Sequence, residues 1–294
     1  MLVLITAFGG AFVAGVLVWW WAHTWWPSDV TAPSLDAAAA THARRHRRMV
    51  RWVSARLQPD VATGSMLALV AAVSTIGGGA VGLVLAMVRT HRGFAVFDSV
   101  AARFGATHAT PTSTHVLRLV TQFGGALLLV PITVVVGVVE ARRMRSWATV
   151  AFLAIVVGGQ YLLADIIKAV VDRARPDLLR LTGFSGPSFP SGHAVASSAT
   201  FAAFALLVGR GRSGRAKALL AGASAAAAVL ICATRVLLGV HWLTDVIAGV
   251  FLGWTWFAAT SIAFGGRRLR FASPATQASL AGSVSLASSD TSQP

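Results

Sequence analysis

Residues 217–264 determine the fold class, because they contain two long apolar runs separated by only three residues. The first run is KALLAGASAAAAVLICATRVLL (217–238), the connection is GVH, and the second run is WLTDVIAGVFLGWTWFAATSIAF (242–264). An α-helix of about 20 apolar residues crosses a hydrocarbon core about 30 Å thick. Five further runs of this kind lie at about 1–22, 64–88, 119–139, 147–168 and 193–209. The sequence therefore predicts an all-α fold, a polytopic transmembrane helical bundle.

The composition supports a membrane protein. Of 294 residues, 55% are hydrophobic and 12% are charged, whereas a soluble domain carries about 25% charged residues. This excludes a soluble globular enzyme, a disordered chain and a fibrous protein. The single cysteine, Cys232, excludes a disulfide framework and a cysteine-rich metal site. The net charge of +15 would suggest nucleic acid in a soluble protein. In a membrane protein it follows from the positive-inside rule, so no nucleic-acid partner is expected.

Four segments are expected along the chain. Residues 1–26 form an N-terminal transmembrane helix, which we interpret as uncleaved because no basic segment precedes it. Residues 27–63 form a basic cytoplasmic linker, within which 36–58 is either a helix lying on the membrane surface or a solvated connection. Residues 64–266 hold the other six spans, and the Ser-, Thr- and Ala-rich residues 267–294 form a disordered tail.

Two details of the six-span segment follow from its sequence. Residues 94–116 are expected to form an external loop with one short helix over Phe94, Phe97, Val100 and Ala101. The run at 193–209 is the shortest, so its helix is expected to recruit residues before His193.

Loop charges predict the orientation in the membrane. Sixteen of the 25 basic residues fall in segments 44–56, 142–145, 210–217 and 267–270, which lie on alternate loops. The positive-inside rule places these segments in the cytoplasm. The other nine basic residues map to the external side: Arg89, Arg92, Arg103, Arg118, Lys168, Arg173, Arg175, Arg180 and Arg235. Several of them cluster near two later loops, against the rule, and function is expected there.

The first motif consists of Lys168, Arg175 and Pro176. Seven residues, or two helical turns, separate the two cations, so both are expected on one helix face. Pro176 predicts that the helix ends near Arg175. A point charge and a planar fork that converge suit a phosphate. The alternative is that both side chains extend to the lipid headgroups. The neighbouring carboxylates are expected to pair with Lys168 or Arg173: Asp165 and Asp172.

The second motif is Pro190-Ser191-Gly192-His193, at the start of the fifth span of the 1–264 region. Ser191 is expected to be an N-cap, and Gly192 allows the backbone to approach a ligand closely. The first N–H groups of the helix would then point at an anion, with His193 facing the same pocket. The alternative is an ordinary loop and cap.

The third motif spans Arg235, His241 and Asp245. A charge near the end of a transmembrane helix is costly unless it has a partner. His241 and Asp245 are four residues apart, so the carboxylate can accept from one ring nitrogen and fix the tautomer. The other nitrogen then keeps a lone pair that can act as a nucleophile. The alternative is a structural His–Asp pair at the interface.

All three motifs fall on the external side by the loop-charge argument. Together they gather three cations, a helix N-terminus and two histidines around one anion-sized space. No Cys/His/Glu metal cluster accompanies them, so the sequence does not require a metal.

These residues resemble the type 2 phosphatidic acid phosphatase (PAP2) superfamily, whose pattern is KxxxxxxRP, then PSGH, then SRxxxxxHxxxD. The first two motifs match in full, and the third departs only at Thr234, where the family usually has Ser. Thr keeps a hydroxyl that can donate to a phosphate oxygen. The resemblance covers about residues 64–264, implying a six-helix PAP2-like core plus one extra N-terminal helix.

The resemblance also implies a role for each residue. His241 would attack phosphorus, Asp245 would orient and activate it, and His193 would protonate the leaving alcohol. The remaining site residues would hold the phosphate oxygens: Lys168, Arg175, Ser191, Gly192 and Arg235. Such stabilisation of spread negative charge is most of the work in phosphoryl transfer.

We therefore expect an integral-membrane lipid phosphatase, multi-pass in the cell membrane (a bacterial inner membrane), with its active site on the external side. It would hydrolyse a phosphate or diphosphate monoester of a lipid through a phosphohistidine, without metal or cofactor. Candidate substrates are a polyprenyl diphosphate, phosphatidic acid or phosphatidylglycerol phosphate. The expected partners are this lipid phosphate and the bilayer, and no oligomeric state is implied. The alternative is a phosphotransferase that passes the phosphoryl or headgroup unit to another lipid or glycan. A non-enzymatic anion transporter is disfavoured, because few polar residues occur within the spans.

Overall fold

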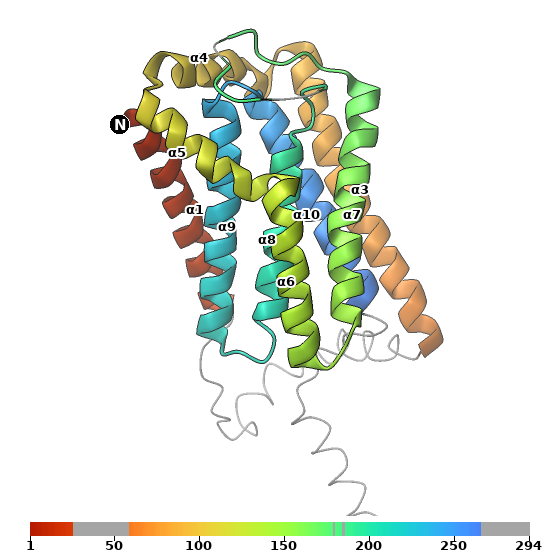
Figure 1. Cartoon of the computed structure of the whole chain (residues 1–294). Helices are drawn as coiled ribbons and strands as arrows, with labels where there is room; N and C mark the ends of the chain where they lie inside the picture. Colours follow the sequence, from red (N-terminus) through yellow and green to blue (C-terminus); the bar gives the residue numbers. More distant parts are fainter. Residues whose placement is uncertain (26–58, 179, 184–185, 266–294) are drawn as a thin grey trace, which may run out of the picture.

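The computed structural model describes residues 1–25, 59–178, 180–183 and 186–265, with the side chains of 25, 59–66 and 265 excepted. Seven helices in these ranges run along one bundle (Figure 1): α1 (Leu2–Trp25), α3 (Pro59–Thr90), α6 (Ala126–Met144), α7 (Ala148–Val171), α8 (Gly192–Val208), α9 (Gly214–Leu237) and α10 (Leu243–Gly265). Shorter helices connect α3 to α6: η1 (Gly93–Phe97), α4 (Asp98–His108), α5 (Pro111–Thr121) and η2 (Gln122–Gly124). We call the end of the bundle that carries α4 the α4 end. Segment 36–58, expected as a surface helix or a solvated connection, and the tail at 267–294 lie outside the described residues.

The bundle is that of a multi-pass membrane protein. In the described part of the chain, α1, α3, α7, α9 and α10 are long and apolar enough to cross a membrane, and α5 with α6 makes a sixth, bent span. α8 has 17 residues, at the lower limit for a crossing helix. Large apolar side chains face outward, as lipid contact requires, including Ile76, Leu127 and Val170 at 74–80% exposure. The predicted all-α transmembrane bundle is confirmed.

The predicted span at 119–139 is wrong in its boundaries. α5 ends at Thr121, and α6 begins only at Ala126 after a 47° bend. The bend falls at Gly124 and Gly125, where the backbone passes close to other elements. A Cβ on Gly124 would lie 2.5 Å from Cγ2 of Ile231, so a larger residue would not fit. Glycines are apolar enough to leave the hydropathy of the run intact, which is why the sequence indicated one straight helix.

The segment at 94–116 contains more helix than expected. One short helix was predicted, but η1 and α4 follow one another directly and α5 begins at Pro111. Thr110 starts α5 with a capping box, because its hydroxyl accepts from the Ser113 N–H at 3.1 Å and the Ser113 hydroxyl accepts from the Thr110 N–H at 2.9 Å. α4 lies across the end of the bundle, and α5 slopes down from it to the start of α6 (Figure 1).

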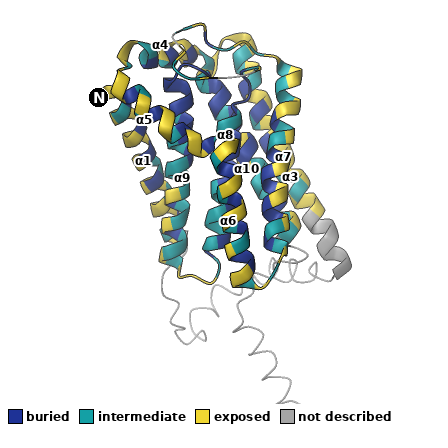
Figure 2. Cartoon of the chain, in the orientation of Figure 1, coloured by how far each residue is buried: buried dark blue, intermediate teal, exposed yellow. Residues whose placement is uncertain are grey.

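α8 is the central helix and explains how a short span can be stable. It packs against α7, α9 and α10, and the residues of its first half are almost all buried, as the dark blue segment in Figure 2 shows. α10 approaches it closely through Gly253, where a Cβ would lie 2.5 Å from the Val195 carbonyl oxygen. The helix begins at Gly192, so it recruits one residue before His193. Because α8 is enclosed by other helices, it does not need the full length of a lipid-facing span.

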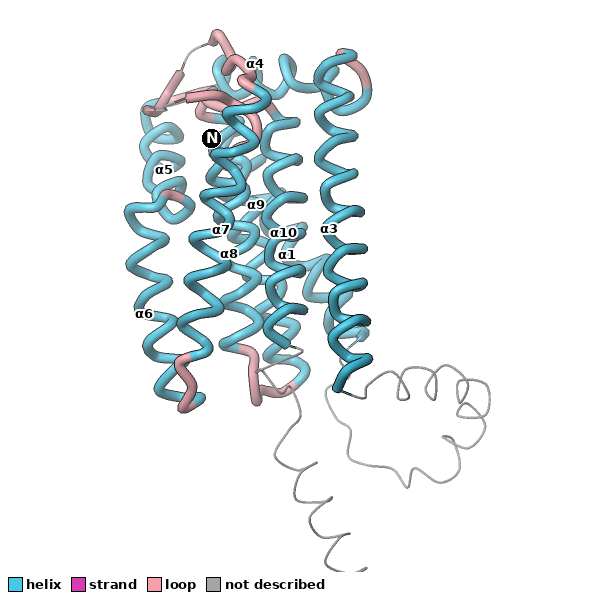
Figure 3. Tube along the Cα trace, turned by 90° about the vertical axis from the view of Figure 1, so that its right-hand side faces the viewer, coloured by secondary structure: helices cyan, strands magenta, loops and turns pink. Residues whose placement is uncertain are grey.

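α1 and α3 lie at opposite sides of the bundle. α1 packs along α9, where Gly15 and Gly222 allow close contact: a Cβ on Gly222 would lie 2.6 Å from the Gly15 carbonyl oxygen. α3 packs against α10, and the perpendicular view of Figure 3 shows it at the edge of the bundle. The same view shows the loops that follow α7 at the end that carries α4.

Candidate active site

The eight predicted site residues come together at the α4 end. They lie at the C-terminal ends of α7 and α9, in the loops that follow these helices, and in the first turns of α8 and α10. The basic segments 142–145 and 210–217 lie at the opposite end of the bundle, where α6 meets α7 and α8 meets α9 (Figure 1). The basic segments 44–56 and 267–270 are outside the described residues. The charge asymmetry predicted from the sequence is therefore present in the part of the chain that the structure describes.

His241 lies in the tight turn between α9 and α10 and is buried, with 2% of its surface exposed. Its Nε2 is 3.1 Å from Nη1 of Arg175. A guanidinium can only donate hydrogen bonds, so Nε2 accepts and the ring proton must be on Nδ1. Nδ1 faces Oδ2 of Asp245 at 3.5 Å, which is an ion-pair distance and longer than a good hydrogen bond. The Nε2 lone pair is thus directed toward the cations.

Burial determines the charge state of His241. Removal from solvent lowers the pKa of His241 to about 4, against the opposing effect of the Asp245 carboxylate. The imidazole is therefore neutral at neutral pH, which is the state in which a ring nitrogen can act as a nucleophile.

Asp245 is held in place by three donors. Nη1 of Arg173 donates to Oδ1 at 2.5 Å, while the Ser188 hydroxyl and the Trp242 N–H, the latter at 2.8 Å, donate to Oδ2. These contacts fix the carboxylate opposite His241. Ser188 and Arg173 were not predicted as site residues.

Arg173 in turn is held by Asp98, at the start of α4. Nη2 of Arg173 donates to Oδ2 of Asp98 at 2.8 Å. Asp98 also accepts from the Thr244 N–H at 2.8 Å and the Thr244 hydroxyl at 2.7 Å. The chain Asp98–Arg173–Asp245 thus joins α4 to the first turn of α10. Sequence spacing could not find it, because Asp98 lies 75 residues before Arg173, and the only signal was the unexplained positive charge of Arg173.

Of the two carboxylates predicted to pair with Lys168 or Arg173, Asp165 does so and Asp172 ends a helix instead. Asp165 lies 3.5 Å from Lys168, as expected. Asp172 is exposed, and it takes the left-handed conformation (φ 44°) that ends α7. The helix therefore ends at Val171, and the prediction that Lys168 and Arg175 share a helix face is wrong. The loop after α7 brings the two cations to the site instead.

Arg175 is anchored by backbone carbonyls of three loop residues. Nε donates to Gly186 at 2.9 Å, Nη1 to Val240 at 2.7 Å and Nη2 to Pro187 at 3.1 Å. Burial lowers the pKa of Arg175 below its usual value, and the carboxylate of Asp245 opposes this change. The guanidinium stays charged at neutral pH. A cleft of about 450 Å³ opens beside it, lined also by Arg173 and Arg180.

Arg235 projects from the last turns of α9 and is 4% exposed. Its Nη1 donates to the Thr121 hydroxyl at 3.0 Å, while its Nε has no hydrogen-bond partner among the described residues. The preceding Thr234 donates its hydroxyl proton to the Ile231 carbonyl at 2.6 Å. In this structure the single hydroxyl proton is used within α9, and the ability of Thr234 to donate to a phosphate oxygen stays a prediction.

Ser191 is the N-cap residue of α8 by position, but its side chain makes no capping bond. Its N–H donates to the Asp245 carbonyl at 3.0 Å. Its hydroxyl is buried and has no partner among the described residues. Gly192 follows, and a Cβ there would lie 3.3 Å from Nζ of Lys168. The free hydroxyl and the first amides of α8 thus lie beside a cation, an arrangement that suits an anion.

His193 lies against the bend between α5 and α6. A Cβ on Gly125 would lie 3.4 Å from its Nε2, and one on Gly124 would lie 3.3 Å from its Cδ2. The ring is within electrostatic range of Arg235, His241, Lys168 and Arg175. The bend missed by sequence reasoning therefore forms one wall of the space around this histidine.

The fold and the site together define a multi-pass membrane protein that can hold a phosphate-sized anion against a neutral histidine. Arg175 contacts Nε2 of His241, Arg235 lies within electrostatic range of the same ring, and Lys168 lies beside the N-terminus of α8. Among the described residues, no group of three or more His, Cys, Asp or Glu side chains could hold a metal ion.

Known proteins are similar to this chain in sequence. The PAP2 superfamily matches residues 148–268, which include all three motifs. The chain is 34% identical to a lipid A 1-phosphatase of Rhizobium johnstonii over 187 residues, covering 55% of this chain and 72% of that protein. It is 30% identical to phosphatidylglycerophosphatase B of Bacillus subtilis, covering 49% of this chain and 71% of that protein.

A solved structure is also similar to this chain. The crystal structure of a transmembrane PAP2-type phosphatidylglycerolphosphate phosphatase from Bacillus subtilis superposes with a TM-score of 0.59 at 26% identity, covering 65% of this chain and 95% of that one. The chain belongs to the PAP2 superfamily, and it is a membrane lipid phosphatase.

Proposed function

We propose that the protein hydrolyses a phosphate monoester or diphosphate of a lipid through a phosphohistidine on His241, at the external face of the membrane. The observation that carries this proposal is the 3.1 Å contact between Arg175 Nη1 and His241 Nε2. It requires a lone pair on Nε2, and it directs that lone pair to the place where a guanidinium would hold a phosphate oxygen.

In the first step, Nε2 of His241 attacks phosphorus as the bond to the lipid oxygen breaks. The proton on Nδ1 faces Asp245, whose carboxylate stabilises the imidazolium that forms. With a monoester, His193 gives a proton to the leaving alkoxide, so the lipid departs as an alcohol; with a diphosphate, the leaving group is the lipid monophosphate. In the second step, water gives a proton back to His193 and attacks phosphorus, which releases inorganic phosphate and restores neutral His241.

The phosphate oxygens are assigned to Lys168, Arg175 and Arg235, together with the Ser191 hydroxyl and the Gly192 amide. The unpaired Nε of Arg235 and the unpaired hydroxyl of Ser191 support this assignment, because buried polar groups without partners are rare unless a ligand or water completes them. These cations stabilise the charge of the transition state, the work that Mg²⁺ does in other phosphatases.

The external location rests on the positive-inside rule applied to segments 142–145 and 210–217, at the end of the bundle opposite the site. The proposed domain organisation keeps α1 as an N-terminal span and 64–266 as the catalytic domain. The substrates named for the relatives, lipid A and phosphatidylglycerophosphate, support a lipid whose phosphate monoester lies at the membrane surface.

The experiment measures phosphate release by the purified protein over a panel of lipid phosphates: phosphatidic acid, phosphatidylglycerol phosphate, a polyprenyl diphosphate and lipid A 1-phosphate. One lipid should show saturable release, with no dependence on an added acceptor. His115→Ala is the matched control for His241→Ala, because His115 is an exposed histidine of α5 outside the site. Release that requires a second lipid or glycan as acceptor would identify a phosphotransferase instead.

The face is tested separately with single cysteines in a Cys232→Ala background and a thiol reagent that does not cross membranes. A cysteine at Gly183, in the loop after α7, should react on intact cells. A cysteine at Ser213, at the start of α9, should react only after lysis. The reverse pattern would contradict the external location and leave the chemistry unaffected.

A further inference from the structure

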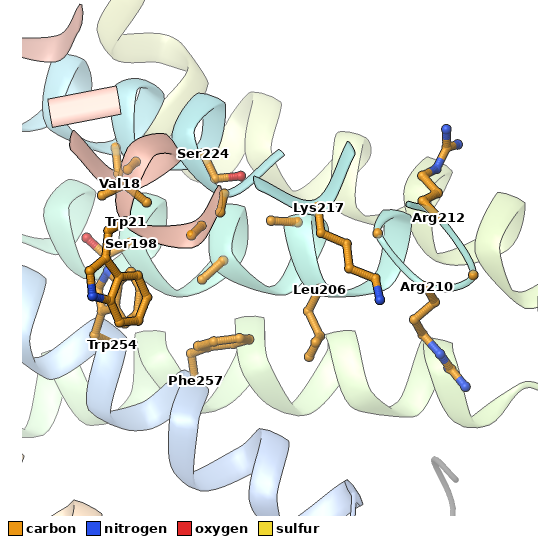
Figure 4. Close-up of a pocket in the computed structure, with 18 of the residues that line it drawn as sticks. Val18, Trp21, Ser198, Leu206, Arg210, Arg212, Lys217, Ser224, Trp254 and Phe257 are labelled. Atoms are coloured by element: carbon orange, nitrogen blue, oxygen red, sulfur yellow. The ribbon is translucent and has the colours of Figure 1, made fainter. Parts of the chain in front are cut away.

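A cavity at the end of the bundle opposite the α4 end has no part in the proposed reaction. Its volume is about 1000 Å³, and it lies between α1, α8, α9 and α10. Figure 4 shows three basic side chains at one end of it, and Trp21 with Trp254 toward the other. The site histidines are at the other end of α8 and in the turn after α9, so the cavity is a separate feature.

The length of the cavity matches one leaflet of a bilayer. Its lining on α8 runs from Ser198 to Gly209, which is about 16 Å of helix at about 1.5 Å per residue. Half of a hydrocarbon core about 30 Å thick is about 15 Å. The wall is mainly apolar, with Leu206 and Phe257 along it. Alanines such as Ala225 leave the space open, so the cavity suits one extended acyl chain.

The cavity reaches the outer surface of the bundle. Trp21 of α1 and Trp254 of α10 both line it, and they are 58% and 49% exposed. A lipid could therefore enter sideways from the membrane between these two helices, without passing through water.

The polar end of the cavity is cationic. Arg210, Arg212 and Lys217 line it. Nε of Arg212 donates to the Val208 carbonyl at 2.8 Å. Within the described residues, the ion pairs of the structure give neither Arg212 nor Lys217 a carboxylate partner. Arginine and lysine together suit a phosphate group, and the apolar wall beside them suits an acyl chain. The combination matches an anionic phospholipid rather than a zwitterionic one.

We propose that this cavity binds an anionic glycerophospholipid from the leaflet at this end of the bundle. Its phosphate lies at the end of the cavity that Arg212 and Lys217 line, and one acyl chain extends toward Trp254 between α8 and α10. The lipid is a bound structural ligand and not a substrate, so the proposal is independent of the catalytic function.

The test compares phosphatidylglycerol with phosphatidylcholine of the same acyl chains, by native mass spectrometry and by thermal unfolding of the purified full chain. Phosphatidylglycerol has no phosphate monoester, so the phosphatase cannot consume it. The charge variant is Arg212→Ala with Lys217→Ala. Its matched control is Arg142→Ala with Arg215→Ala, which removes the same charge from exposed residues that do not line the cavity.

Wild type and control should retain phosphatidylglycerol more tightly than phosphatidylcholine. The charge variant should lose about tenfold in phosphatidylglycerol affinity, the scale for one hydrogen bond to a charged group, with unchanged phosphate release. Ala225→Phe, which fills the cavity, should lose both lipids, whereas Ala223→Phe on the exposed side of α9 should not. Equal phosphatidylglycerol affinity in the two double variants, or retention unaffected by Ala225→Phe, would overturn the proposal.

Discussion

Replacing Asp98 with asparagine changes a side chain that touches none of the proposed phosphate ligands. Asp98 is 5% exposed and accepts three hydrogen bonds, from Arg173 at 2.8 Å and from Thr244 at 2.8 and 2.7 Å. Asparagine keeps the shape and one acceptor oxygen but loses the charge. Of the two ionic partners that the described residues give Arg173, Asp245 then remains, and the carboxylate opposite His241 is less firmly oriented.

The size of the effect follows from the charged hydrogen bond between Asp98 and Arg173 that the substitution weakens. A hydrogen bond to a charged group contributes about 1.5–3 kcal/mol, and each 1.36 kcal/mol of transition-state stabilisation is about tenfold in rate. We expect kcat to fall about 10- to 100-fold. KM should change little, because the cations assigned to the phosphate remain in place. The unfolding midpoint should also fall, since Arg173 becomes a less well paired buried charge.

The assay is steady-state phosphate release, with thermal unfolding measured in parallel. Asp177→Asn is the control, because Asp177 is fully exposed and only 3.7 Å from Arg180 in the same region. Arg173→Gln should not add its full effect to that of Asp98→Asn, because both variants act through Asp245. A kcat within twofold of wild type for Asp98→Asn would refute the positioning argument.

Three further predictions concern metal, arginine geometry and pH. Activity should persist in excess EDTA, because chain cations stabilise the transition state; loss on chelation with restoration by one divalent metal would contradict this. Arg235→Lys keeps the charge and loses the planar fork, so kcat/KM should fall by the factor that corresponds to about 2–4 kcal/mol of lost transition-state stabilisation. Near-normal turnover would make Arg235 a structural residue only. With an activated leaving group that needs no proton, kcat/KM, corrected for ionisation of the substrate, should stay level as pH falls from 7 toward 5. The reason is that burial lowers the pKa of His241 to about 4, and only below that value does protonation remove its lone pair. An acid limb near 6.5 would contradict the buried state of His241.

The transmembrane bundle could be predicted from length and hydropathy, because each lipid-facing helix must match the thickness of the bilayer. That the three motifs lie at one end of the bundle could be predicted from charge. The basic residues of alternate loops place Lys168, His193 and His241 on the same side of the membrane. The bend at Gly124 could not, because a glycine pair does not interrupt an apolar run. The bend depends on close contact of the glycines with Ile231 and His193, and both residues are distant from Gly124 in the sequence.

The same reason applies to the polar network. Asp98 and Arg173 meet only because α4 folds across the end of the bundle, and no local period records that contact. The end of α7 at Val171 depends on the left-handed conformation of Asp172. Pro176 indicated that the helix ends near Arg175, because a proline disfavours the helical conformation in the residue before it. Thr234 has its hydroxyl bonded within α9, a choice between two acceptors that sequence cannot make.

The central claim is that His241 forms a bond to phosphorus. The most direct test uses a lipid phosphate with radioactive phosphorus, stops the reaction rapidly without acid, and measures the label bound to the protein. The wild-type chain should carry label that is stable to alkali and released by acid, as a phosphoramidate requires, and His241→Ala should carry none. His193→Ala should still become labelled when the leaving group is activated, because the attack does not use His193. Label on the His241→Ala chain equal to wild type, or label found on a residue other than His241, would contradict the account.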